Sequence, residues 1–221
     1  MKSTLYILQR NLVRLTWLGP AAGYLVVVVA LMPYSAPVTS MMPILGIGSL
    51  VIGAWVSVTT IDGDDPSQKS AVALASGGRL RARVGEVWAS FLFIAPLSVV
   101  GLVIAFTRAS PVPEVEALPF LVGGALVVLL TTTLLGVALG YLFAWPVLQR
   151  TPIALGVVFL VAIVLVVVPA SPVSALLATP DQGFSGLSVA SAAFGTMAIS
   201  AACFGAGSML VTRRWRLTSP R

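Results

Sequence analysis

The sequence predicts an all-α integral membrane protein with six transmembrane helices. Hydrophobic residues make up 58% of the 221 residues and charged residues only 9%, whereas a soluble domain carries about a quarter charged residues. Six apolar stretches are each about long enough to cross the hydrocarbon core of a bilayer. Isolated strands would leave backbone groups unpaired in lipid, so we expect helices. The remaining length holds no soluble domain of ordinary size, which predicts a single transmembrane domain over residues 1–221.

The six expected spans have no Asp, Glu, Lys or Arg at their centres. The first and the fifth are near the lower length limit for a transmembrane helix. In chain order, the spans cover residues 16–32, 42–60, 87–107, 118–148, 152–170 and 187–212.

The basic residues are sorted between the two sides of the membrane. Twelve of the 13 Lys and Arg residues lie at the two chain ends and in the second-to-third and fourth-to-fifth connections. The other three connections contain only Arg108, together with Glu114, Glu116 and Asp181. The positive-inside rule therefore places both termini in the cytoplasm and predicts a multi-pass protein of the bacterial inner membrane. The same rule accounts for the net charge of +6 without a nucleic-acid partner.

The residues before the first span predict an amphipathic helix at about 4–15, lying on the cytoplasmic membrane surface. A simple membrane anchor and a helix that also contacts a partner both remain open. Leucines gather on one side of the projected helix and arginines on the other: Leu5, Leu8, Leu12 and Leu15 against Arg10 and Arg14.

The second-to-third connection, residues 62–84, contains a short helix with signals at both ends. Asp65 suits the N-cap, Pro66 suits the first helical position, and Gln68 has the spacing of a capping box. Gly77 is suited to the left-handed residue that ends a helix. We therefore expect a helix at about 66–76.

Beyond that helix, arginines alternate with small and apolar residues up to Glu86 and Trp88, where lipid headgroups and an aromatic anchor are expected. An ordinary charged loop is the alternative interpretation of the connection. A loop without a partner, however, has little use for a capped helix.

This ordered combination resembles the permease subunit of type 2 ABC exporters, also called ABC-2-type transporters, over nearly the whole chain. Members of that family have an N-terminal interface helix, six spans, cytoplasmic termini and a coupling helix between the second and third spans. Short or re-entrant helices also occur in their outer fifth-to-sixth connection, to which residues 172–180 correspond.

The resemblance implies a separate ATPase subunit that binds ATP and Mg²⁺, grips the coupling helix and drives export. It also implies a second permease copy or homologue, and an amphiphilic or hydrophobic substrate such as a lipid, a lipid-linked glycan, a peptide or an antibiotic. The substrate-binding residues stay unknown. The three arginines of the segment are as well suited to anionic lipid headgroups as to the ATPase. The implied contact residues are Asp65, Pro66, Gln68, Lys69, Val72, Leu74, Arg79, Arg81 and Arg83.

The chain lacks the motifs of an enzyme. It has no Walker sequence and no histidine, so we expect no ATP hydrolysis, no catalysis and no cofactor in this chain. The run 183–186 resembles the serine motif of rhomboid proteases but lacks a histidine base, and Asp62, Asp64 and Asp65 have no further ligands beside them. Cys203 lies alone in an apolar run, which excludes an intrachain disulfide.

Two other functions are alternatives to the exporter. An ion-coupled secondary transporter normally carries Asp, Glu or Arg inside its spans, and their absence here counts against it. A non-transporting membrane scaffold or immunity protein would not need a capped cytoplasmic helix but would tolerate one.

Small and polar residues within the spans predict how the helices pack. The pairs Gly136/Gly140 and Gly19/Gly23 and the run 200–207 allow close helix contacts, for which packing within the chain is favoured over dimerisation. Pro96 and Pro146 are suited to bending their helices. The few polar groups of the fourth span are Thr131, Thr132, Thr133 and Tyr141.

Overall fold

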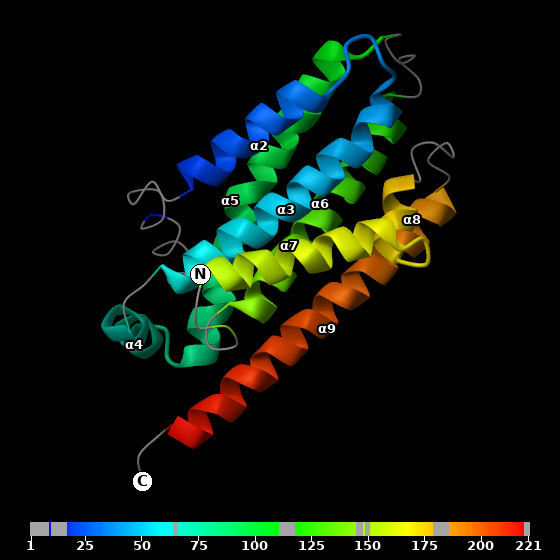
Figure 1. Cartoon of the computed structure of the whole chain (residues 1–221). Helices are drawn as coiled ribbons and strands as arrows, with labels where there is room; N and C mark the ends of the chain where they lie inside the picture. Colours follow the sequence, from blue (N-terminus) through cyan, green and yellow to red (C-terminus); the bar gives the residue numbers. More distant parts are fainter. Residues whose placement is uncertain are drawn as a thin grey trace.

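The computed structural model describes Gln9 and residues 17–63, 66–110, 118–144, 148, 151–178 and 186–218. At residues 66–67, 186–187 and 213–218 it describes the backbone alone. The described residues form helices and turns without any strand, which confirms the all-α class for this part of the chain. In Figure 1 the long helices run side by side as a bundle. The helices with assigned bounds are α2 (Leu18–Leu31), α3 (Val38–Asp62), α4 (Pro66–Ala75), α5 (Arg79–Arg108), α6 (Leu118–Phe143), α7 (Thr151–Val167), α8 (Pro172–Ala178) and α9 (Gly186–Thr218).

Helix α3 is the centre of the bundle, and 67% of its apolar span is buried. Its backbone packs directly against α6, because glycines replace side chains at the crossing. A Cβ atom at Gly136 would collide with the Leu50 carbonyl, and one at Gly140 would lie 2.6 Å from the Ala54 carbonyl oxygen. The predicted use of Gly136 and Gly140 in packing within the chain is confirmed.

The other predicted glycine pair behaves differently. Gly19 and Gly23 are exposed on α2, and a Cβ atom at either position would meet nothing within 4 Å. Helix α2 instead packs on the bundle through its opposite side, formed by Pro20, Ala21, Tyr24 and Val28. Packing within this chain, expected for both pairs, therefore holds only for the pair on α6.

Arg108, at the end of α5, makes a hydrogen bond and a cation–π contact with the end of α2 and the α2–α3 connection. Arg108 donates from Nη1 to the Val29 carbonyl at 2.6 Å, and its guanidinium lies 4.4 Å from the centre of the Tyr34 ring. Two backbone hydrogen bonds, from Ser35 to Arg108 and from Ser110 to Ala36, complete this join. Arg108 is the one basic residue that the sequence placed on the outer side, and here it has a structural use on that connection.

Helix α7 breaks before α8, and the pair is bent by 61°. Ser171 caps α8 by accepting the Val173 N–H at 3.1 Å, with Pro172 at the first helical position. Val173, Leu176 and Leu177 of α8 are buried, and Leu177 packs on Gly46 of α3. The predicted short helix within 172–180 is thus present and turns into the bundle.

The helices have the length and composition of membrane spans. α3, α5, α6 and the 188–212 part of α9 are each long and apolar enough to cross a membrane, and α7 with α8 makes a fifth if the bent pair is one span. α2 has 14 residues and rises about 21 Å, less than the roughly 30 Å of hydrocarbon. Each predicted apolar stretch contains a helix, but the structure supports four or five spans, and six stays a prediction.

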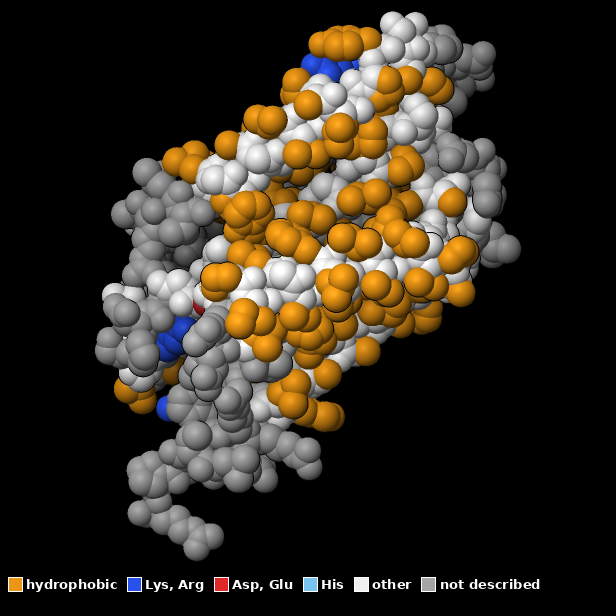
Figure 2. Space-filling model, in the orientation of Figure 1, with side chains coloured by type: hydrophobic (Ala, Val, Ile, Leu, Met, Phe, Trp, Pro, Cys, Tyr) orange, Lys and Arg blue, Asp and Glu red, His pale blue; other side chains and the backbone are white. Residues whose placement is uncertain are grey.

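The surface agrees with a membrane environment. Figure 2 shows hydrophobic side chains across the middle of the visible face, with Lys and Arg side chains toward its two ends. In Figure 1, α4 and the C-terminal end of α9 lie at one end of the bundle, and α8 and the α2–α3 connection lie at the other. The predicted topology requires this grouping of segments.

Candidate functional site

Helix α4 and the turn after it form the candidate site, at one end of the bundle (Figure 1). Gly77 has φ +72°, the left-handed conformation expected for it. The Gly78 N–H bonds to the Ala73 carbonyl at 2.8 Å and the Gly77 N–H to the Leu74 carbonyl at 3.1 Å. This pair of bonds is the Schellman motif, which satisfies the last carbonyls of a helix. The local signal in the sequence therefore correctly predicted the end of α4.

The turn from α4 into α5 is short and depends on glycine. Gly78 has φ +141°, a conformation that side-chain-bearing residues rarely adopt, and its carbonyl accepts the Ala82 N–H at 3.1 Å. Only residues 76–78 separate the two helices. Because this turn has both ends hydrogen-bonded, α4 is held closely to the start of α5.

The exposed surface of α4 and the start of α5 is partly apolar. Leu74 is 84% exposed on α4, and Leu80 and Val84 on α5 are about half exposed, at 47% and 48%. Arg79 and Arg81 are also exposed, whereas Ala73 is buried. Exposed apolar side chains beside cationic ones are typical of surfaces that bind a protein partner or a membrane surface.

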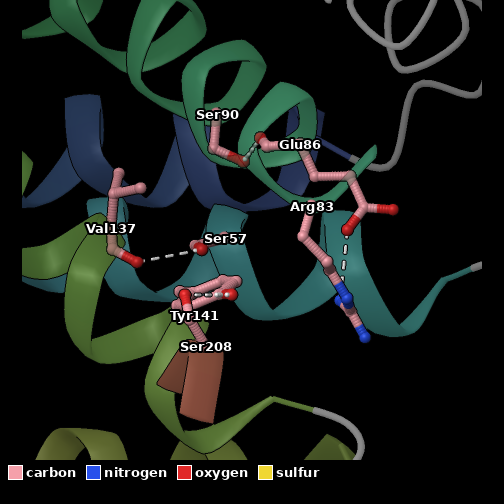
Figure 3. A network of polar contacts seen from close by, with 7 residues as sticks. All are labelled: Ser57, Arg83, Glu86, Ser90, Val137, Tyr141 and Ser208. Carbon is pink, nitrogen blue, oxygen red and sulfur yellow. Dashed lines mark hydrogen bonds and ion pairs between the residues drawn. The ribbon is translucent and has the colours of Figure 1, made fainter. Parts of the chain in front are cut away.

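One arginine of the segment differs from the other two. Arg83 donates from Nη1 to Glu86 Oε2 at 3.1 Å, and the two side chains are only 8% and 6% exposed. Figure 3 shows both residues on the same helix, with Ser90 one turn beyond Glu86. The sequence expectation grouped Arg83 with Arg79 and Arg81 as contacts to a partner or to headgroups. Arg83 lies on the buried side of α5 together with Glu86, whereas Val84 beside it is 48% exposed, so the charge of Arg83 is paired inside the chain.

The remaining predicted contact residues have mixed exposure. Gln68 is exposed, while Lys69 and Val72 are half-buried. The side chain of Pro66 lies outside the described part, although its backbone begins α4 as predicted. Asp65 and the interface-helix residues Leu5, Leu8, Arg10, Leu12 and Arg14 lie outside the described residues.

The four polar residues predicted for α6 all make hydrogen bonds inside the bundle. Thr131, Thr132 and Thr133 are buried and each donates to a carbonyl three or four residues earlier on α6. Tyr141 contacts Ser208 of α9 at 3.2 Å, and Ser57 donates to the Val137 carbonyl at 3.1 Å (Figure 3). The threonine bonds lie within α6, whereas the Tyr141 and Ser57 contacts join α6 to α9 and to α3.

Sequence reasoning missed the role of Glu86, which it had assigned only to the headgroup region. The available signal was the spacing of three residues from Arg83, which puts two side chains on one side of a helix. Within the described residues, no group of three or more His, Cys, Asp and Glu side chains is placed to hold a metal ion.

These features define the class of protein. The described part of the chain is all-helical, and its long apolar helices are those of a multi-pass membrane protein, with a short capped helix at one end of the bundle. Comparison of the chain with protein families, curated proteins and solved structures finds no match in any of the three.

Proposed function

We propose that the chain is the membrane-spanning subunit of an ATP-driven exporter of the type 2 ABC class, with α4 as its coupling helix. A separate ATPase subunit, which binds ATP and Mg²⁺, docks on α4 and the start of α5. The observation that carries the proposal is the capped helix α4, which exposes Leu74 at the end of the bundle and joins α5 through a turn of three residues.

The turn supports this proposal mechanically. A partner that displaces α4 displaces α5 with it, because only three residues separate the two helices and both ends of this turn are hydrogen-bonded. Helix α5 has 30 residues and is about 45 Å long, so it carries this movement through the full thickness of a bilayer. The buried Arg83–Glu86 pair lies near the start of α5 and joins two side chains of that helix.

The packing of the bundle favours a pathway between two copies. The backbones of α3 and α6 are in direct contact. The threonine hydroxyls of α6 donate hydrogen bonds to carbonyls of their own helix. By contrast, only 28% of the α9 span is buried, and it exposes Phe194, Met197 and Met209. We therefore place an amphiphilic or hydrophobic substrate at an apolar surface between this chain and a second permease, a copy or a homologue.

In this proposal α2 and the bent α7–α8 pair complete six spans, with residues 4–15 as an interface helix. Both termini and α4 face the cytoplasm of a bacterial cell, as the distribution of Lys and Arg predicts. The exporter subunit itself hydrolyses no nucleotide. An ion-coupled transporter and a membrane scaffold or immunity protein remain the alternatives, and neither explains the exposed, capped α4.

Affinity purification of the tagged full-length chain from its native membranes tests the proposal. We expect a nucleotide-binding subunit with a Walker motif to copurify, as identified by mass spectrometry. Leu74→Asp should remove that subunit, since Leu74 is 84% exposed and the substitution does not disturb the core. The matched control is Tyr34→Asp, which adds the same charge at a residue 75% exposed in the α2–α3 connection.

The control should retain the ATPase. If no such subunit copurifies from membranes that contain the chain, or if Leu74→Asp retains it as well as Tyr34→Asp does, the coupling assignment of α4 is wrong. Insertion of both variants is checked by their recovery in the membrane fraction.

A further inference from the structure

A stripe of exposed side chains runs along the first half of α5, cationic at its start and apolar beyond. Arg81 begins the stripe, and the residues that follow at intervals of three or four are Val84, Trp88 and Leu92. This spacing puts all four side chains on one side of the helix. The three apolar ones are 48%, 51% and 51% exposed, and Arg79 adds a second exposed cation two residues before Arg81. The stripe therefore combines two positive charges at one end with a continuous apolar surface.

The stripe crosses the level at which lipid headgroups meet hydrocarbon. Helix α5 has 30 residues and is about 45 Å long, which exceeds the roughly 30 Å hydrocarbon core of a bilayer by about ten residues. All of its charged residues other than Arg108 lie within residues 79–86, so the excess length belongs to its start. Trp88 follows at the depth where aromatic side chains anchor a helix, and Leu92 lies one turn further, in the hydrocarbon.

The other basic side chains that the structure describes are placed differently. Arg83 is buried and paired with Glu86, and Arg108 is bonded to the end of α2 at the opposite end of the bundle. Lys69 is half-buried on α4. Among the described side chains, exposed arginines therefore occur only at the start of α5, where they adjoin the apolar stripe.

We propose that the start of α5 binds one anionic phospholipid, from the leaflet at this end of the bundle. Its phosphate lies at Arg79 and Arg81, and one acyl chain lies along Val84, Trp88 and Leu92. A guanidinium group suits this headgroup because its planar fork of N–H donors matches the oxygens of a phosphate. The apolar part of the stripe, residues 84–92, extends about 12 Å, close to the roughly 15 Å of hydrocarbon in one leaflet.

The length of the stripe favours a lipid over a protein as the occupant. A water-soluble subunit reaches the two arginines at headgroup level but does not follow the helix into the hydrocarbon as far as Leu92. A phospholipid presents its anion and its acyl chain in the same order as α5 presents cations and apolar side chains. The ring of Trp88 gives that chain a supported surface, because it packs edge-on against Phe91 with 5.9 Å between ring centres. The site belongs to α5 alone and does not rest on the proposed function.

Native mass spectrometry of the purified full-length chain tests the headgroup part of the site. The delipidated protein is titrated in detergent with phosphatidylglycerol or with zwitterionic phosphatidylcholine of the same acyl chains. We expect one phosphatidylglycerol to bind at least about fivefold more tightly, since each cation near a membrane surface contributes roughly that factor for an anionic lipid. Arg81→Gln should lower this preference about fivefold. Lys69→Gln, which removes the same charge from α4, should retain it. Equal binding of the two lipids by the unaltered protein, or equal losses in the two variants, would overturn the proposal.

Trp88→Ala tests the apolar part of the site in the same titration. We expect it to weaken the binding of both lipids several-fold and to leave the preference for phosphatidylglycerol unchanged. The matched control is Phe120→Ala on α6, which truncates an aromatic side chain that is 58% exposed, against 51% for Trp88, and should bind both lipids as the unaltered protein does. If Arg81→Gln reduces binding but Trp88→Ala does not, the arginines bind a phosphate or an acidic protein surface without an acyl chain, and the proposal is wrong.

Discussion

Arg83 and Glu86 form a buried ion pair, with Nη1 and Oε2 3.1 Å apart, on the first three turns of α5. Their neighbours Arg79 and Arg81 are exposed on the same short stretch of helix. The stretch therefore has two parts with different physical requirements. The exposed part lies at the surface of the protein, and the buried part needs a partner for each of its charges.

Arg83→Ala should destabilise the protein far more than Arg81→Ala. Arg83→Ala breaks a buried ion pair, which costs about 3–5 kcal/mol in comparable cases. Arg81 is exposed, so its removal should change the free energy of unfolding by less than about 0.5 kcal/mol. Unfolding of both variants in the same detergent, followed by heat or denaturant, measures the difference. Similar losses in the two variants would show that the pair does not support α5.

Gly136→Ala should disrupt the crossing of α3 and α6. The added methyl group would collide with the Leu50 carbonyl, which belongs to a backbone that cannot move aside, and overpacking of this kind costs about 1–3 kcal/mol or more. Gly156→Ala on α7 is the matched control, since a Cβ atom there meets nothing within 4 Å. We expect a lower melting temperature for the first variant and an unchanged or slightly higher one for the second. The same loss in both would mean that these helices do not pack as described.

Cysteine labelling in whole cells should separate the two ends of the bundle. In a Cys203→Ser background, we expect a membrane-impermeant maleimide to modify Tyr34→Cys from outside the cell and to leave Leu74→Cys unmodified until the cells are opened. Both positions are well exposed, at 75% and 84%, so burial does not explain a difference. Labelling of Leu74→Cys in intact cells would reverse the orientation and remove the cytoplasmic docking surface from the proposed function.

Local features of the sequence were sufficient for the helices and for the shape of α4. Apolar length predicted a helix in each of the six stretches, and Pro66 and Gly77 marked the beginning and the end of α4 within a residue or so. These features depend on neighbours in the chain, on backbone conformation and on capping, which a sequence displays directly. The short helix α8 was expected only from the family resemblance, and its burial was not expected.

Contacts between distant segments were not accessible in the same way. Two glycine pairs with the same spacing have different environments. Gly136 packs against the backbone of α3, whereas a Cβ atom at Gly19 would have no neighbour within 4 Å. Three arginines in one segment also differ, because Arg83 lies on the side of α5 that packs on the bundle while Arg79 and Arg81 are exposed. Likewise, nothing in the second and third apolar stretches indicated that the Ser49 hydroxyl of α3 would lie 3.0 Å from the Ser98 hydroxyl of α5.

The sequence by itself thus determined that the chain is a helical membrane protein with a capped helix between α3 and α5, because hydrophobic length and helix capping are local properties. The tertiary structure alone decided which charge is buried, which glycines touch and which hydroxyls meet across the bundle. Those outcomes depend on the angles and depths at which helices cross, and packing sets these between residues far apart in the chain.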